Sequence, residues 1–268
     1  QDVNLLINDD DQGSDTSPQN LEGTATDDTL DATANGGYAD DVLDGKKGAD
    51  SMNGGEGNDT YYVDNVKDSI VEEDQSDSLA GDADLVHSTA TSFVLPANVE
   101  NLIIDGKGKG DATGNELDNV LTGNGAINKL LGLDGNDVLD GGAGKDILSG
   151  GDGADSFNFT TNVKGSKNVD TITDFTVGED VLVLDSRIFT KLAKAMDFTS
   201  GDESTTIDYD FFASGAKIKP SDANSFILYD TATGRVYDDE DGSGKAAPNW
   251  FITLTGKPDL TPDDIFIV

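Results

Sequence analysis

The chain has 268 residues and no cysteine, and 53 acidic residues against 17 basic residues give it a formal net charge of −36. This charge excludes nucleic acid as a partner, because nucleic-acid binding requires a basic surface. It also makes the compact chain repel itself, so we expect disorder without bound cations and order with them. The absence of cysteine excludes disulfides and fits either a cytosolic protein or one that metal ions stabilise.

Residues 1–20 contain the apolar segment VNLLI and then an acidic run with Ser and Pro, which predicts a linker or the end of a preceding domain. The acidic run fits a solvated loop equally well, and its carboxylates are an alternative candidate for a calcium site at a domain junction. Because the sequence begins at Gln1 without a signal peptide, we expect a piece of a longer protein. No apolar run is long enough to span a membrane, so we expect no membrane insertion.

Nine-residue repeats fill two blocks of the chain, residues 23–62 and 114–158. The first block contains a four-residue insertion, and the clearest copies follow one another over residues 132–158. Each repeat has Gly in its first position, Asp or Asn in its sixth and an apolar residue in its eighth. The eighth positions are Leu30, Leu43, Met52, Tyr61, Leu121, Leu130, Leu139, Leu148 and Phe157. This pattern matches the nonapeptide of calcium-binding parallel β-rolls.

The residue types of the repeat suit a calcium site on a stack of short strands. Glycine lets the backbone take positive φ and brings its carbonyl groups close to an ion, and Asp supplies the hard oxygen that Ca²⁺ prefers. The last three residues of a repeat form a strand whose eighth side chain points into the core. Two repeats make one coil, so Asp137 and Asp155, which are two repeats apart, should stack over one another with Ca²⁺ between them.

The repeats supply most of the candidate calcium ligands. Those of the first block are Asp28, Gly36, Gly37, Asp41, Gly45, Gly48, Asp50, Gly54, Gly55, Gly57 and Asp59. Those of the second block are Asn128, Gly132, Gly135, Asp137, Gly141, Gly142, Gly144, Asp146, Gly150, Gly151, Gly153 and Asp155. Several calcium ions are therefore expected.

The spacing of the sixth positions ranks the expected sites. We expect the strongest binding where two Asp residues are separated by two repeats and nothing else, as in the pairs Asp41–Asp59 and Asp137–Asp155. The pair Asp28–Asp50 is further apart because of the insertion, so we rank it lower. The pairs Asn119–Asp137 and Asn128–Asp146 lose one charge each and should bind more weakly.

Residues 63–113, between the two blocks, contain apolar runs split by Pro96, which predict strands that continue the stack or pack beside it, without a helix. His87, the single histidine, is expected to be an exposed strand residue, because a lone histidine cannot build a zinc site or a general-base pair.

Residues 169–184 alternate apolar and polar side chains, which predicts strands that cap the roll. Asp170, Asp174 and Asp180 are candidates to bind one last ion, or are simply loop acids. Residues 186–198 have apolar side chains at helical spacing, which predicts a helix with Ser186 as its N-cap.

Residues 207–268 predict strands near 226–229, 234–237 and 250–254. The segment DDEDGSGK between the last two resembles the start of an EF-hand loop, with Asp239 and Asp241 as candidate ligands. It lacks the distal Glu of that loop, so a solvated acidic turn is the alternative. The chain ends with DDIFIV, whose four apolar residues must either pack or be recognised by a partner.

The chain resembles the repeats-in-toxin (RTX) proteins of Gram-negative bacteria over residues 21–268. The resemblance is carried by the nonapeptides and by TYYVDNVKDSIVE, VLPANVENLII, VDTITDF, YDTATGRVYDDEDGSGK, LTGKPDLT and the acidic-then-apolar terminus. It implies the calcium-binding β-roll and C-terminal type I secretion region of a larger exported protein. The type I secretion transporter would read the C-terminus, and the protein would be secreted or lie on the cell surface. Departures at Thr26, Leu117 and Ala126, which replace glycine, put the ions at those turns in doubt.

The expected fold is therefore all-β: a right-handed parallel β-roll in two blocks, with capping strands, one short helix and a β-rich tail. We expect a linker at 1–20, the roll at 21–185, and a capping and secretion region at 186–268. No catalytic motif with a Ser, His or Cys nucleophile or base occurs, so we expect a monomeric calcium-binding module, within an adhesin, rather than an enzyme. The alternatives are a non-catalytic part of a calcium-dependent secreted epimerase, protease or lipase, and an adhesin segment that contacts ice, glycan or another surface.

Overall fold

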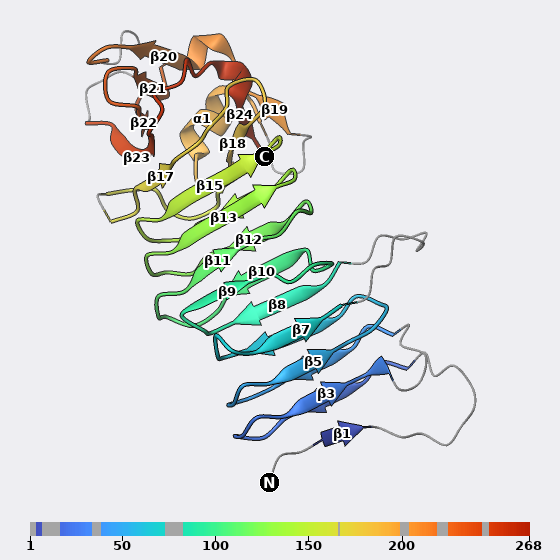
Figure 1. Ribbon diagram of the computed structural model, residues 1–268. Helices are drawn as coiled ribbons and strands as arrows, with labels where there is room; N and C mark the ends of the chain where they lie inside the picture. Colours follow the sequence, from blue (N-terminus) through green and yellow to red (C-terminus); the bar gives the residue numbers. More distant parts are fainter. Residues whose placement is uncertain are drawn as a thin grey trace. The chain divides into compact units, whose positions relative to one another are not determined.

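The structure of the chain is a computed structural model. It describes the backbone of residues 4–6 and all of residues 17–33, 39–72, 83–165, 167–198, 204–218, 225–242 and 247–268. The chain forms two compact units, Gln1–Leu121 and Thr122–Val268 (Figure 1).

Unit 1 is a stack of short parallel strands. They are β1 (Asn4–Leu6), β2 (Asn20–Glu22), β3 (Thr29–Asp31), β4 (Val42–Asp44), β5 (Ser51–Asn53), β6 (Thr60–Val63), β7 (Ser69–Val71), β8 (Leu85–Ser88), β9 (Ser92–Val94), β10 (Asn101–Ile104) and β11 (Asp111–Thr113). In this unit the orders are β1-β3-β5-β7, β2-β4-β6-β8-β10 and β9-β11. Strand β12 (Val120–Thr122) spans the boundary of the two units.

The register of unit 1 follows the repeat length. Leu43 pairs with Tyr61, which lies two repeats further along the chain. Leu30 pairs with Met52, and their separation is one coil plus the four-residue insertion. Strands β7 to β11 lie in residues 63–113. Of the two predicted arrangements, strands that continue the stack or strands that pack beside it, the first is present.

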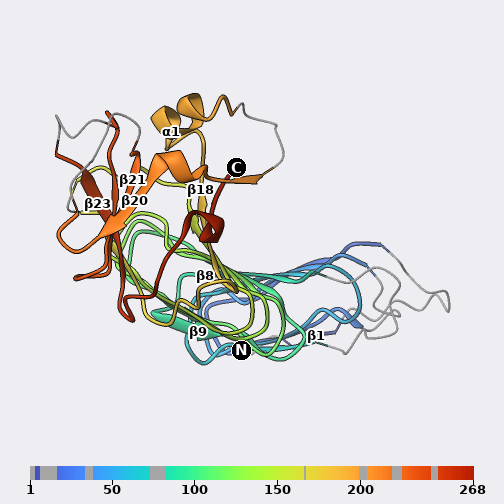
Figure 2. The same ribbon diagram turned by 90° about the horizontal axis from the view of Figure 1, so that it is seen from above.

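Unit 2 continues with parallel strands and ends in a mixed tail. Its elements are β13 (Lys129–Asp134), β14 (Val138–Asp140), β15 (Ile147–Asp152), β16 (Ser156–Phe159), β17 (Asp170–Ile172), β18 (Val181–Leu184), α1 (Thr190–Ala195), β19 (Thr205–Thr206), β20 (Phe212–Gly215), β21 (Ile227–Asp230), β22 (Arg235–Asp238), β23 (Asn249–Leu254) and β24 (Ile265–Ile267). Within the unit the orders are β14-β16-β18-β24-β19 and β13-β15-β17-β23-β22-β21-β20. Seen from above, the yellow-green coils of this unit lie over one another (Figure 2).

The eighth position of every repeat is in the core, as predicted. Residues Leu30, Leu43, Met52, Tyr61, Leu121, Leu130, Leu139, Leu148 and Phe157 all have 0% exposure. Burying one such side chain contributes about 1.5–3 kcal/mol, so the successive coils are held by a continuous apolar column inside each unit. The all-β fold, a parallel β-solenoid with one short helix and a β-rich tail, is confirmed.

Residues 169–184 add a further coil, which differs from the predicted cap. Strands β17 and β18 pair in parallel with β15 and β16, and they are covered in turn by β23 and β24. The end of the roll is therefore capped by strands of the tail and not by residues 169–184. Ile265 and Ile267 of β24 are fully buried, so the apolar end of the sequence packs inside unit 2.

The helix is shorter than predicted and Ser186 is not its N-cap. Helix α1 begins at Thr190, and the residue before it makes no side-chain cap hydrogen bond. The physical reason is Asp185, whose Oδ1 accepts a hydrogen bond of 2.8 Å from the backbone N–H of Arg187 and starts a separate turn. The apolar stripe packs as expected, because Phe189 and Leu192 are buried and the Phe189 ring lies 5.4 Å from that of Phe251 in β23.

Candidate metal centre

The sixth-position carboxylates of unit 1 form two hydrogen-bonded ladders. In one, the backbone N–H of Asp41 donates to Oδ1 of Asp59 over 2.7 Å. In the other, the N–H of Asp28 donates to Oδ1 of Asp50 over 2.8 Å. Each carboxylate thus reaches back to the coil before it, which places the acids of successive coils directly over one another. The stacking expected for Asp41–Asp59 and Asp28–Asp50 is present.

Unit 2 has the same arrangement. The N–H of Asp137 donates to Oδ1 of Asp155 over 2.9 Å, and the N–H of Asn128 donates to Oδ1 of Asp146 over 2.8 Å. The pairs Asp137–Asp155 and Asn128–Asp146 are therefore stacked as predicted. The fifth expected pair, Asn119–Asp137, combines one residue of each unit and stays a prediction.

The ladders continue beyond the nonapeptides. Of the four acids that extend them, Asp170 and Asp180 are candidates from the sequence, whereas Asp68 and Asp84 are not among its candidates. Asp68 and Asp84 accept from the N–H groups of Asp50 and Asp59 at 3.0 and 2.7 Å. Asp170 and Asp180 accept in the same way from Asp146 and Asp155, at 2.9 and 3.0 Å. A signal exists in the sequence, because each of these four acids lies directly before or at the start of a short strand, much as the sixth-position Asp precedes the strand of each repeat.

The second oxygen of several ladder carboxylates has no partner among the described residues. Oδ2 of Asp50, Asp146 and Asp155 is buried and accepts no hydrogen bond from them, and each of these residues is 1% exposed. An ionised group in this position is costly unless a cation or a donor compensates it. Burial raises the pKa of Asp155 to about 6, with Asp180, Asp174 and Glu179 adding repulsion.

The first-position glycines leave room for these oxygens. A Cβ on Gly150 would overlap Oδ2 of Asp155, and one on Gly132 would overlap both Oδ2 of Asp137 and the carbonyl oxygen of Gly150. Backbone carbonyl and carboxylate oxygens therefore gather at the same place.

The fourth-position glycine brings a second carbonyl to the stack. Gly153 has φ +137°, and a Cβ there would overlap the carbonyl oxygen of Gly135 in the coil before it. Gly57 takes the same form, with φ +125° against the carbonyl of Ala39. Side-chain and main-chain oxygens without a competing donor are the ligand set that Ca²⁺ takes, so the residues fit the ion.

In turns that depart from the repeat, the side chain of the sixth residue accepts hydrogen bonds from its own turn. Oδ1 of Asn128 accepts from the N–H of Asn124 at 2.9 Å, and Oδ2 of Asp28 accepts from the N–H and Oγ1 of Thr24 at 2.5 and 2.8 Å. Oxygens that already accept hydrogen bonds are poorer ligands. This geometry is in keeping with the lower rank given to these turns.

Three candidate acids outside the repeats have different surroundings. Asp174 accepts hydrogen bonds from Ser149 Oγ (2.6 Å) and Gly150 N (3.2 Å), beside the Asp155 coil. Asp170 lies in β17, whereas Asp180 directly precedes β18 of the other sheet. A single ion held by all three acids stays a prediction, with loop acids as the alternative.

The tail loop is only partly described. Asp239 is buried and Asp241 is exposed in the turn closed by Gly242 N and the Asp239 carbonyl at 3.0 Å. The EF-hand-like interpretation includes residues 243–246, which lie outside the described part, and it stays a prediction. Gly36 and Gly37 also lie outside the described residues.

His87 takes part in a pair with no metal-ligand character. Its Nδ1 lies 3.0 Å from Oδ2 of Asp105, and its ring stacks on Tyr62 with 5.0 Å between centroids. The side chain is 22% exposed, so it is more covered than predicted.

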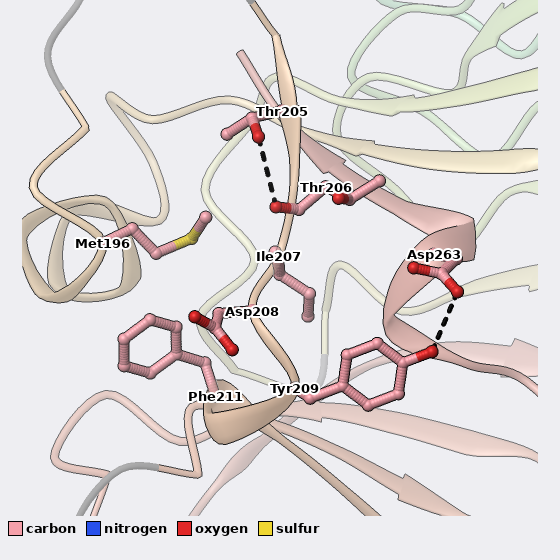
Figure 3. Close-up of a pocket in the computed structure, with 8 residues that line it drawn as sticks. All are labelled: Met196, Thr205, Thr206, Ile207, Asp208, Tyr209, Phe211 and Asp263. Carbon is pink, nitrogen blue, oxygen red and sulfur yellow. Dashed lines mark hydrogen bonds between the residues drawn. The ribbon is translucent and has the colours of Figure 1, made fainter.

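A hollow of about 400 Å³ in unit 2 lies between the helix end, β19 and the turn before β24 (Figure 3). Its acids are Asp208 and Asp263, and Asp263 accepts a hydrogen bond of 2.8 Å from Tyr209. It includes none of the ladder carboxylates, so the candidate metal centre is separate from it.

None of the helices in the described residues has the length and apolar character needed to cross a membrane.

Comparison with known proteins agrees with this geometry. A scan against protein-family models finds the RTX calcium-binding nonapeptide repeat in four copies, at residues 35–70 and 122–157. No curated protein matches the chain. The matched stretches contain the stacked pairs Asp41–Asp59, Asp137–Asp155 and Asn128–Asp146 and the glycines described above. A repeat β-roll of this kind is a structural, non-catalytic element. The chain therefore carries an RTX module built on calcium-binding nonapeptide repeats.

Proposed function

We propose that this module folds on binding Ca²⁺ outside the cell and forms the C-terminal part of a larger protein, an adhesin, exported by a type I secretion transporter. The observation that carries the proposal is the set of buried ladder oxygens at Asp50, Asp146 and Asp155, for which the described residues supply no donor. The folded chain needs a cation at these positions. In a chain of net charge −36, the unfolded state is favoured wherever that cation is scarce.

The magnitudes support a switch. Extracellular calcium modules bind with dissociation constants of about 10⁻⁴–10⁻³ M. At about ten times that constant each ion adds roughly 1.4 kcal/mol, so four to six ions add on the order of 6–8 kcal/mol. This equals the whole stability of an ordinary domain, about 5–15 kcal/mol. In cytosol, where free Ca²⁺ lies far below the constant, the contribution is close to zero.

The buried tail is the second support. Ile265 and Ile267 are covered within unit 2, and the N–H of Val268 donates to the carbonyl of Leu184 at 3.0 Å. A transporter that reads these residues must do so while the chain is unfolded. A chain kept unfolded by low calcium meets this requirement, and folding after export then buries the signal. We propose that the folded module is a monomer that neither binds nucleic acid nor inserts into a membrane.

Calcium titration calorimetry with Mg²⁺ as the control ion tests the binding. We expect several Ca²⁺ ions per chain and a β-sheet signal that rises with them, with a much weaker effect of Mg²⁺. Asp137→Ala should raise the calcium concentration needed for folding far more than Asn119→Ala, because only the first removes a charge. Equal effects of the two substitutions would refute the ranking of the sites.

Co-expression with a type I transporter tests the export. Deleting residues 261–268 should stop appearance of the protein in the medium. Asp155→Ala should leave export intact while raising the calcium concentration needed for folding. Export that is unaffected by the deletion would refute the role of the tail.

A further inference from the structure

A cluster of three acidic residues lies in unit 1, where the first repeat block ends. One carboxylate oxygen from each of Asp59, Glu72 and Asp84 lies within 4.8 Å of the other two. Asp59 is the sixth residue of a nonapeptide, whereas Glu72 follows β7 and Asp84 directly precedes β8. The last two lie outside the repeats and outside the stretches that match the family.

Asp59 points an uncompensated oxygen at this cluster. The residue is 1% exposed, and its Oδ1 accepts from the N–H of Asp41. Its Oδ2 is buried and is assigned no hydrogen bond within the described part of the chain. Three carboxylates so close together repel one another strongly, and one of them has an oxygen that nothing in the described part of the chain satisfies.

Gly54 and Tyr61 fix the direction of that oxygen. A Cβ on Gly54 would overlap both Oδ2 of Asp59 and the hydroxyl of Tyr61, so these two oxygens lie on the same side of Gly54. The Tyr61 hydroxyl accepts from the N–H of Gly54 at 2.9 Å and donates its single proton to Oε1 of Glu72. Oδ2 of Asp59 therefore faces the Glu72 side of the cluster.

We propose that Asp59, Glu72 and Asp84 form a Ca²⁺ site made of three side-chain carboxylates, outside the nonapeptide scheme of glycine carbonyls. Calcium–oxygen distances are about 2.3–2.6 Å, so two ligands of one ion are at most about 5 Å apart. The spacing within this cluster meets that limit. The site rests on the proposed function and extends it by linking the coil of Asp59 to β7, which Glu72 follows, and to β8, which Asp84 precedes.

The carboxylate of Glu72 and the phenol ring of Tyr61 allow an experiment to distinguish this site from the other proposed calcium sites. Terbium(III) takes the same hard oxygen ligands as Ca²⁺, and its luminescence is sensitised by an aromatic ring close to the ion. Tyr61 is hydrogen-bonded to Glu72, which places its ring beside the proposed ion. Phe occupies the same repeat position at residue 157 with 0% exposure, so Tyr61→Phe retains the packing and all three carboxylates.

The test compares Glu72→Gln with Glu116→Gln, an exposed acid of the same unit, by terbium titration and Ca²⁺ competition. Glu72→Gln should reduce tyrosine-sensitised emission at low terbium and raise the terbium concentration needed for half-maximal emission at least tenfold. Tyr61→Phe should remove much of the same emission without loss of Ca²⁺-dependent folding. Glu116→Gln should behave as the wild type.

Two results overturn the inference and leave the proposed function standing. One is a Glu72→Gln variant that matches Glu116→Gln while both fold with Ca²⁺. The other is emission unchanged by Tyr61→Phe, which would place the bound ions elsewhere. A wild-type chain that binds neither Ca²⁺ nor terbium would instead refute the proposed function itself.

Discussion

Replacing Asp155 by Asn should destabilise the calcium-bound protein and spare the calcium-free chain. Asp155 belongs to two stacked pairs, because its Oδ1 accepts from Asp137 at 2.9 Å and its own N–H donates to Asp180 at 3.0 Å. The amide oxygen of Asn can retain the first bond. What the substitution removes is the charge and the buried Oδ2, which has no hydrogen-bond partner in the ranges that the structure describes.

The expected magnitude follows from the number of ions that share this carboxylate. Loss of one ion at about ten times its dissociation constant costs roughly 1.4 kcal/mol, and loss of the two ions of both pairs costs about 3 kcal/mol. In chelator the expected effect on stability has the opposite sign, because the variant no longer buries an uncompensated charge. The variant should then retain at least as much β-structure as the wild type.

Urea unfolding in saturating Ca²⁺, followed by tryptophan fluorescence, measures this effect. Trp250 is the single tryptophan and lies in β23 of unit 2, with the Arg235 guanidinium 4.0 Å from its ring centre. Asp152→Asn is the matched control, since Asp152 is an exposed acid close to Asp155 in the chain. If Asp155→Asn lost equal stability with and without Ca²⁺, the carboxylate would be a structural hydrogen-bond acceptor and the reasoning would fail.

Three further predictions concern strain, the tail and pH. Leu133→Gly should add about 1 kcal/mol in urea unfolding, because Leu133 has φ +95° and is 43% exposed; a loss would show that the backbone is not strained. Ile265→Ala should cost about 2–4 kcal/mol and Val268→Ala less than about 0.5 kcal/mol, since only the first is fully buried; equal costs would contradict the buried tail. Burial raises the pKa of Asp59 to about 7 and of Asp155 to about 6 from 3.8, so the calcium-free fold is stabilised at low pH and loses that stability as pH rises to 7. Circular dichroism in chelator should show more β-structure at pH 5 than at pH 7.5, and the opposite order would refute the assignment.

The solenoid and its apolar column follow from the sequence because one periodicity determines both. A residue in the sixth position faces the stack and one in the eighth faces the core, whatever occupies the positions between them. Asp155 and Phe157 could therefore be placed from spacing alone. Asn119 and Asn128 could be recognised as departures from the same pattern.

Features that depend on loops of irregular length could not be predicted in this way. Asp84 pairs with Asp59 although more than two repeat lengths of chain separate them, because the connection between them departs from the repeat. Glu72 reaches the same place only through the fold of β6 and β7. The helix starts at Thr190 and not at Ser186 because Asp185 competes for the cap, a choice that spacing does not determine.

The tail shows the same limit. The segment DDIFIV could either pack or stay exposed for recognition, and the apolar pattern alone does not decide between them. In the fold, β24 pairs in parallel with β18 and Ile265 is buried. The tertiary partner, which lies far earlier in the chain, decides the outcome.

Far-UV circular dichroism of the chelated chain at pH 7.5, as Ca²⁺ is added, tests the central claim most directly. The buried, uncompensated carboxylates predict an unfolded spectrum in chelator and a cooperative rise of β-sheet signal at calcium concentrations of about 10⁻⁴–10⁻³ M. Mg²⁺ at the same concentrations should leave the spectrum close to that of the chelated chain. Full β-sheet content in chelator would contradict the account.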